Sequence, residues 1–262
     1  MHTFTHREGS LPIVVSVPHA GMALPAELTS RLTAAGLERV DTDWHVPRLY
    51  DFLEGWDVTV QVANFSRYVV DLNRPPDDTP LYEGATNGLC PTQTFSGEPI
   101  YLPEKEPSAS EIAERIRTYH TPYHHQLVET LARLRAVHRK VVLVDLHSIA
   151  SNIPRLFDGQ LPHFNIGTAD GHSADPDVAA RVYEHFASYP EYDVVANGRF
   201  KGGYITRRYG LPDTGVHAIQ LELAQRSYMR EDCPQVYDAA YAARVRPVLE
   251  GFFALLRTWV GQ

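Results

Sequence analysis

Short apolar runs along the chain predict the strands of a buried sheet. Residues 141–149 read VVLVDLHSI, in which four apolar residues precede Asp145 and His147. An uninterrupted run of Val and Leu is typical of a strand buried on both faces, as in a parallel sheet. Residues 13–17 (IVVSV) follow the same plan and lead to His19. Further strands are predicted at 57–62, 68–72, 164–168, 192–196 and 217–223.

Helices are predicted between these strands, and several carry start or stop signals. The first covers 25–36, with Pro25 near its start and Gly36 past its end. Another begins at about residue 176, where Asp175 is the expected N-cap, and runs to about 189. The remaining helices are expected at 43–54, at 110–137 with a disturbance near Pro122, and at 235–259. This alternation of strands and helices predicts a three-layer α/β fold with a mixed central sheet.

Two stretches lack periodicity. Residues 73–108 are rich in Pro, Gly, Thr and Asp, and residues 197–210 (NGRFKGGYITRRYG) are rich in Gly and Arg. Long irregular segments inside a compact domain are usually functional or mobile. Both stretches are therefore candidates for a loop that closes over a ligand.

Composition predicts one folded domain over residues 1–262. The chain is 44% hydrophobic and 21% charged, which is enough to bury a full core. It has no run approaching the roughly 18 apolar residues of a membrane span, and its first ten residues, MHTFTHREGS, contain no apolar signal segment. We expect a cytoplasmic protein. Cys90 and Cys233 lack a CxxC spacing, so both are expected to be free thiols.

The charge balance restricts the class of partner. A formal net charge of −8 without Lys/Arg-rich runs argues against binding to nucleic acid or to anionic membranes. A small acidic substrate remains compatible, because a few arginines in a cleft can invert the local field. The pattern carries no signal for an oligomeric state.

The two strand-end histidines, His19 and His147, suggest a metal site. The carboxyl ends of strands in an α/β sheet are where ligands bind, and catalytic zinc takes three protein ligands and one water. Residues 41–45 (DTDWH) offer a third ligand, with Asp43 preferred because Asp41 is equally explained as a helix N-cap. Each of these side chains has a structural alternative, such as a cap or a buried, hydrogen-bonded histidine.

Arginines near the same elements suggest an anionic substrate. Arg67 precedes the predicted strand 68–72, and Asn73 and Arg74 follow it. A guanidinium matches a carboxylate with two parallel hydrogen bonds. The alternative is that Arg67 or Arg74 forms a surface ion pair with Asp71 or Asp77. Arg207, Arg208 and Lys201 add positive charge to the glycine-rich stretch 197–210.

Glu222 is a carboxylate within the otherwise apolar run HAIQLEL (217–223), on the same face as Gln220. Burying such a group is costly without a partner, and such acids are often functional. Near a metal-activated water Glu222 could serve as a general base; otherwise it is half of a buried ion pair. His217, at the start of the same strand, either lines the site or is a core histidine.

Six sequence blocks together closely resemble the N-formylglutamate amidohydrolase family, from about residue 10 to about residue 255. These blocks are SVPHAG (16–21), DTDWHVPRLYDF (41–52), SRYVVDLNRPPD (66–77), VDLHS (144–148), KGGYITRRYG (201–210) and IQLELAQRSYM (219–229). The resemblance implies a zinc carboxypeptidase-like (phosphorylase/hydrolase-like) α/β fold. It also implies hydrolysis of N-formyl-L-glutamate to formate and L-glutamate, a step of bacterial histidine degradation.

The resemblance further implies roles for individual residues. One zinc ion, or another divalent metal, would be held by His19, His147 and Asp43, the last replacing the acid of an HxxE motif, since Met22 stands three residues after His19. Glu222 would be the general base and Arg67 would polarise the scissile carbonyl. The residues implied to bind substrate are Asn73 and Arg74 at the α-carboxylate, Arg207 or Arg208 at the γ-carboxylate, and His217. The alternatives are a related N-acyl amino acid (aspartoacylase-like) hydrolase and a non-catalytic dicarboxylate-binding protein.

Overall fold

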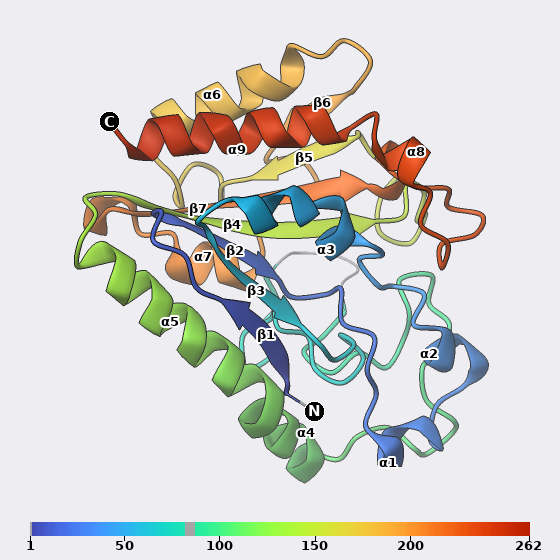
Figure 1. Cartoon of the computed structure of the whole chain (residues 1–262). Coiled ribbons are helices and arrows are strands. Elements are labelled where there is room, and N and C mark those ends of the chain that lie inside the picture. The colour runs from blue at the N-terminus through green and yellow to red at the C-terminus, as the bar shows by residue number, and fades with distance from the viewer. Residues whose placement is uncertain (1, 82–86) are drawn as a thin grey trace.

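A mixed seven-stranded sheet lies at the centre of residues 2–81 and 87–262, which the computed structural model describes (Figure 1). Its strand order is β1-β3-β2-β4-β7-β5-β6. The inner strands β3, β2, β4 and β7 are parallel, whereas β1 and β5 run antiparallel to β3 and β7. The strands are β1 (Phe4–Arg7), β2 (Ile13–Val17), β3 (Thr59–Ala63), β4 (Val141–Ile149), β5 (Phe164–Gly167), β6 (Val194–Ala196) and β7 (Val216–Ala224). The predicted α/β class with a mixed sheet is confirmed.

Helices cover both faces of this sheet, as Figure 1 shows. Helices α5 and α7 pack on one face, and α3, α6 and α9 pack on the other. Among the described residues the α-helices are α1 (Ala26–Thr29), α2 (Ala34–Glu38), α3 (Val46–Leu49), α4 (Ala109–Arg115), α5 (Thr121–Arg135), α6 (Pro176–Ala187), α7 (Tyr204–Tyr209), α8 (Ala239–Ala242) and α9 (Arg246–Val260). None of the helices in this part of the chain is long and apolar enough to cross a membrane.

The two faces of the central strands differ in polarity. Toward α9, β4 and β7 present apolar side chains such as Val144, Leu146 and Leu221. Toward α5 and α7, the same strands are apolar only near their amino ends. Beyond that point Asp145 lies beside Gln220, and then His147 lies beside Glu222. The parallel register therefore places four polar side chains together at the carboxyl end of the sheet.

Residues 68–72, predicted to be a strand, form a turn and irregular backbone instead. The prediction was wrong because the backbone groups of this buried segment pair with side chains rather than with a strand. Arg115 Nη1 donates to Val69 O at 2.9 Å. His124 Nε2 donates to Leu72 O at 2.9 Å. These partners satisfy backbone groups that a sheet ladder would otherwise have to satisfy.

Several helix boundaries also differ from those predicted. The range 25–36 is divided into α1 and α2, because Thr33 caps the second helix and Gly36 lies inside it. The range 43–54 contains only α3 and the 3₁₀ turn Asp51–Gly55. The C-terminal helix starts at Arg246, after the separate α8. Helix α7 occupies part of the stretch expected to be a loop, and β1 was not predicted. Residues 73–81 and 87–108 contain no helix or strand, as expected; residues 82–86 lie outside the described residues.

The predicted helix 110–137 is confirmed, together with its disturbance. A π-helical turn, Ile116–His120, joins α4 to α5 just before Pro122. The wider turn accommodates a residue that lacks an amide N–H, and the helix continues. It leaves the rings of His120 and His124 in contact, tilted by 35° with their centroids 4.1 Å apart. Both donate to the irregular segment, His120 to Arg74 O and His124 to Leu72 O. The long helix thus holds residues 72–74 in place.

His124 predicts an acid sensitivity of the fold. Burial lowers its pKa to about 3, and the neighbouring His120 adds to this effect. The unfolded chain takes up a proton at this group below a pH of about 6.5 while the folded chain does not, so folding stability falls as the pH falls. Between pH 7.5 and pH 5, wild type should lose about 2 kcal/mol more stability than His124→Gln. Urea unfolding at both pH values measures this difference, and parallel losses would contradict it.

Candidate active site

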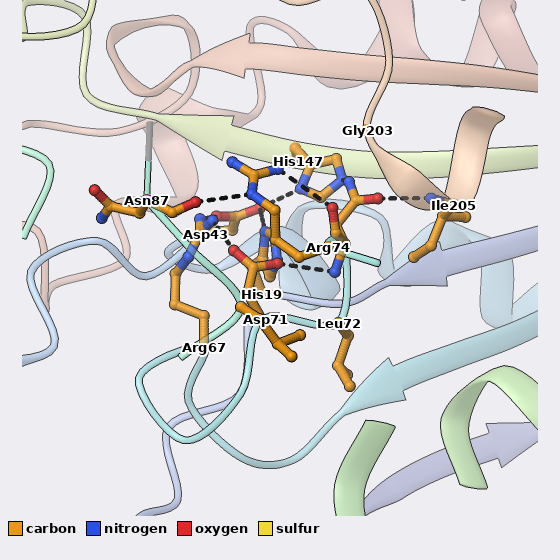
Figure 2. Close-up of polar contacts among 12 residues, drawn as sticks. His19, Asp43, Arg67, Asp71, Leu72, Arg74, Asn87, His147, Gly203 and Ile205 are labelled. Atoms are coloured by element: carbon orange, nitrogen blue, oxygen red, sulfur yellow. Dashed lines mark hydrogen bonds and ion pairs between the residues drawn. The ribbon is translucent and has the colours of Figure 1, made fainter. Parts of the chain in front are cut away.

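Three buried side chains from distant parts of the chain converge at the carboxyl end of the sheet (Figure 2). His19 follows β2, His147 belongs to β4, and Asp43 lies in the segment before α3. One ligand atom from each lies within 4.8 Å of the others. β2 and β4 are neighbours, and the chain continues from β2 to β3 on the opposite side. The group therefore lies at the switch point where α/β sheets bind ligands.

His19 is held by one ring nitrogen and presents the other to the cluster. Its Nε2 is 2.7 Å from Asp71 Oδ1. Its Nδ1 is buried without a hydrogen-bond partner, 3.9 Å from Asp43 Oδ2. Burial lowers the pKa of His19, and the charge of Arg67 lowers it further. A neutral imidazole ligates a metal through one ring nitrogen while its other nitrogen donates to a carboxylate, and here Asp71 is placed to accept from Nε2.

The Nε2 atom of His147 is also held by an aspartate, at 2.9 Å from Asp145 Oδ2. Its Nδ1 likewise faces Asp43, at 3.0 Å from Oδ2. The Ser148 amide also donates to Asp43 Oδ2, at 3.1 Å. Burial alone would lower the pKa of His147, but Asp145 and Asp43 outweigh it and raise that pKa well above its ordinary value. The two carboxylates thus favour a positive charge at this point.

The donor set fits a divalent cation. Four buried acidic side chains surround the imidazoles of His19 and His147, and the buried Arg67 lies within the same group. The four acids are Asp43, Asp71, Asp145 and Glu222. Two histidine nitrogens and one carboxylate, with carboxylates behind the histidines, match a catalytic zinc site, which leaves a position for water. The orphaned Nδ1 of His19 supplies the donor such an ion requires.

The structure distinguishes Asp43 from Asp41. Asp41 is not part of the candidate metal group among the described residues, and its Oδ2 accepts the amide of Phe95 at 2.8 Å. It does not cap α3, which begins after His45. His45 Nε2 itself lies 2.8 Å from Pro234 O. Asp41 therefore anchors the segment that carries Phe95, and Asp43 belongs to the candidate metal group.

Arg67 is buried between two acids and an aromatic ring. Its Nη2 donates to Asp71 Oδ2 at 2.5 Å, and its Nη1 lies 3.8 Å from Asp43 Oδ1. The guanidinium lies over the ring of Phe95, at 4.7 Å from the centroid. Burial alone would raise the pKa of Asp71, but Arg67 and His19 hold it well below its usual range. Arg67 thus supplies a fixed positive charge beside the candidate metal group.

Glu222 lies next to His147 in the register of β4 and β7 and lines the same cavity. Burial raises the pKa of Glu222 to about 8, while the nearby charge of His147 acts in the opposite direction. A carboxyl group with a raised pKa can accept and return a proton near neutral pH. A charged metal in the cluster would lower this pKa again.

Asn73 connects the candidate metal group to helix α7. Its Nδ2 lies 2.9 Å from both Asp145 Oδ2 and His147 Nε2, and its Oδ1 accepts the Ile205 amide at 2.8 Å. This close approach requires glycine at 203, because a Cβ there would lie 2.4 Å from Asn73 Nδ2. Asn73 lines the cavity, but these contacts give its side chain a structural task as well as the predicted substrate contact.

The cavity beside the cluster has two further guanidinium groups in its lining, Arg74 and Arg199. Arg74 Nε donates to Asn87 O at 2.9 Å, as Figure 2 shows. Arg199 Nε donates to Leu156 O at 2.7 Å. The remaining lining includes Asn87, Phe95, Leu156, Phe200, Gly203 and Gln220.

Three predicted substrate contacts are not brought to this cavity. Arg208 is exposed on α7, and Arg207 Nε donates to Gly202 O at 2.9 Å. Neither is among the described residues that line the cavity. His217 lies at the opposite end of β7, paired with Val142 and 4.9 Å from the ring of Trp259. Four strand residues lie between His217 and Glu222, so the two are roughly 16 Å apart along β7. Lys201 pairs with Asp170 at the surface.

The sequence interpretation did not assign a role to Asp145, Gln220 or Arg199, and it offered Asp71 only as a surface ion-pair partner of Arg67 or Arg74, whereas the Arg67–Asp71 pair is buried. Asp145 and Gln220 share a face with His147 and Glu222, so the two-residue period of the strands could have indicated them. Asp71 was hidden by the incorrect strand at 68–72. Arg199 lies in the same glycine-rich stretch as Arg207 and Arg208, and the sequence interpretation assigned a role only to that later pair.

Comparison with known proteins finds relatives over nearly the whole chain. A family model described as N-formylglutamate amidohydrolase matches residues 11–229. An N-formylglutamate deformylase of Pseudomonas aeruginosa is 47% identical over 253 residues, covering 97% of this chain and 95% of that protein. One from Pseudomonas putida is 45% identical over 252 residues, covering 96% and 94%.

Two solved structures share the fold. The N-formylglutamate amidohydrolase from Ralstonia eutropha JMP134 has a TM-score of 0.86 at 25% identity and covers 99% of each chain. A gene product of Agrobacterium tumefaciens has a TM-score of 0.73 at 19% identity, covering 98% of this chain and 96% of that one. The second likeness concerns the fold alone.

The cluster predicts a single tight metal site that depends on Asp43 but not on Asp41. Wild type and Asp41→Asn should each bind one Zn²⁺ per chain, whereas Asp43→Asn should not. At free zinc about 1,000-fold above the dissociation constant, the bound ion should add about 4 kcal/mol to folding stability. Elemental analysis and thermal unfolding with and without zinc measure this. Equal zinc binding by Asp43→Asn, or loss of it in Asp41→Asn, would contradict the assignment.

Proposed function

The chain belongs to the N-formylglutamate amidohydrolase family, and we propose that it hydrolyses N-formyl-L-glutamate to formate and L-glutamate with zinc as its cofactor. The observation that carries the proposal is the position of Glu222, which adjoins His147 and lines the same cavity as the His19–Asp43–His147 group. A general base beside a three-ligand cation site is the arrangement that metal-dependent amide hydrolysis uses.

His19, Asp43 and His147 would hold the ion in this proposal. Zinc bound there would lower the pKa of a coordinated water towards about 7 and polarise the formyl oxygen. Asp71 and Asp145 hold the Nε2 atoms of the two histidines, so that both Nδ1 atoms face the ion. Another divalent metal is compatible with the same donors.

Glu222 would move the proton in both halves of the reaction. As general base it takes a proton from the attacking water, and it then returns this proton to the departing amine of glutamate. Its side chain is buried and lines the same cavity as the candidate ligands, so it is placed to hold this proton between the two steps. The C–N bond of the formamide breaks as the amine is protonated.

Arg67 would stabilise the developing oxyanion. It is buried and held by Asp71, so its charge is already oriented before substrate binds. Preorganised charge of this kind typically contributes a few kcal/mol to transition-state stabilisation. Arg74, on the segment that follows Asn73, would bind the α-carboxylate, and Asn73 would orient both the segment and His147.

The same proposal extends to the domain organisation, the fold type, the cellular location and the pathway. We assign residues 1–262 to one amidohydrolase domain of the zinc carboxypeptidase-like type, acting in the cytoplasm on a small anionic substrate. The proposed place of the reaction is bacterial histidine degradation. The deformylase name of two relatives that cover nearly the whole chain supports this assignment.

Formate release from N-formyl-L-glutamate tests the proposal directly. Activity should disappear on chelation and return with zinc. N-acetyl-L-aspartate and dipeptides should be poor substrates; preference for either would instead identify an aspartoacylase-like or peptide hydrolase. Binding of L-glutamate without hydrolysis of any of these compounds under zinc-replete conditions would indicate a non-catalytic binding protein.

Glu222→Gln separates catalysis from binding. The variant keeps the shape of the side chain but cannot accept a proton, so kcat should fall roughly 10²- to 10⁴-fold. Zinc content and the affinity for L-glutamate should stay close to wild type. A kcat within a few-fold of wild type would remove Glu222 from the role of general base.

A further inference from the structure

We propose that Arg199 is the specificity-determining residue that binds the side-chain carboxylate of the substrate, an inference that rests on the proposed function. Beyond its α-carbon, N-formyl-L-glutamate carries two methylene groups and a second carboxylate. A subsite for this side chain therefore needs an apolar wall that ends in a cation. The cavity beside Glu222 offers such a wall, and Arg199 lies on it.

The wall is the apolar side of the cavity. Phe95, Ile149, Leu156 and Phe200 line it and belong to one hydrophobic cluster. These side chains provide contact for methylene groups and exclude water, which strengthens any ion pair formed at the end of the wall.

Contacts of Arg199 hold it against this wall. Its Nε donates to Leu156 O at 2.7 Å, and its guanidinium lies over the ring of Phe200 at 5.4 Å from the centroid. Phe200 in turn contacts Phe157 edge-on, at 6.2 Å between centroids. A guanidinium whose plane is fixed in this way loses little conformational entropy when it binds a carboxylate.

The other arginines are placed for different tasks. Arg67 is bonded to Asp71 beside the candidate metal group. Arg74 follows Asn73, which contacts His147, so Arg74 lies beside the reacting end of the substrate. The α-carboxylate is separated from the scissile amide only by the α-carbon, and it belongs at that end. Arg199 comes from the separate β6–α7 connection and suits the far carboxylate.

The arginine pair on α7 does not meet this requirement. The helix turns its first residues toward the cavity, since Gly203 N donates to Gln220 Oε1 at 2.7 Å. Arg207 and Arg208 lie about one helical turn further on, roughly 5 Å along the axis. Arg208 is exposed, which makes it a matched control that carries the same charge in the helix following that connection.

The test combines two enzyme variants with two substrates. Arg199→Met and Arg208→Met each replace a guanidinium with an unbranched apolar side chain. N-formyl-L-glutamine has the shape of N-formyl-L-glutamate without the second charge. Wild type and Arg208→Met should prefer the glutamate compound about 10- to 100-fold in kcat/KM, as expected for a charge-assisted carboxylate contact. Arg199→Met should lose that preference by slowing on N-formyl-L-glutamate while staying within about threefold of wild type on N-formyl-L-glutamine.

Three results would overturn the inference: an equal loss on both substrates in Arg199→Met, an unchanged preference in Arg199→Met, or a lost preference in Arg208→Met. The proposed function fails separately, if zinc-loaded wild type releases formate from neither compound. In that case calorimetric binding of L-glutamate and L-glutamine still decides the role of Arg199. A preference for L-glutamate that only Arg199→Met removes would support it, and its absence in wild type or its retention in Arg199→Met would overturn it.

Discussion

The concentration of buried negative charge at the carboxyl end of the sheet is the constraint on which the rest of the site depends. Asp43, Asp71, Asp145 and Glu222 are buried within one group. Uncompensated carboxylates in such surroundings are strongly unfavourable, so each must be paired, hydrogen-bonded or protonated. Arg67 and His19 pair with Asp71, His147 pairs with Asp43 and Asp145, and Glu222 has a raised pKa. A divalent cation held by the two histidines and Asp43 would complete this balance.

The irregular segment between β3 and α4 could not remain buried without help from neighbouring elements. Its carbonyl groups at residues 69, 72 and 74 accept hydrogen bonds from side chains of the long helix formed by α4, the π turn and α5. Asn73, in the middle, is held by the first residues of α7. Side chains thus satisfy carbonyl groups that a sheet ladder would otherwise satisfy. The segment need not be a strand, and it positions Arg67, Asp71 and Arg74 around the cavity.

Much of the architecture could be predicted from the sequence, because β2 and β4 begin as apolar runs, β7 is apolar apart from His217, Gln220 and Glu222, and α6 carries a capping aspartate. The interpretation failed where local composition disagreed with tertiary contacts. Tyr68–Leu72 has the composition of a strand, but hydrogen bonds from distant residues override that propensity. The three side chains of the candidate metal group could be proposed from the sequence because the two histidines follow apolar runs and Asp43 lies in an acidic stretch before a predicted helix. The sequence did not show that Arg207 and Arg208 lie outside the cavity, because spacing within a loop does not reveal which way a helix turns its side chains.

The polarity difference between the two faces of β4 and β7 also bears on how the chain finds its register. A slip of one residue in β7 would turn Gln220 and Glu222 into the apolar layer under α9 and expose Leu221 to the polar cavity. The cost of burying that carboxylate unpaired would disfavour the slipped pairing by several kcal/mol. The residues assigned here to chemistry therefore also discriminate against misfolded pairings, and a variant stripped of them would fold with less fidelity even if it were more stable.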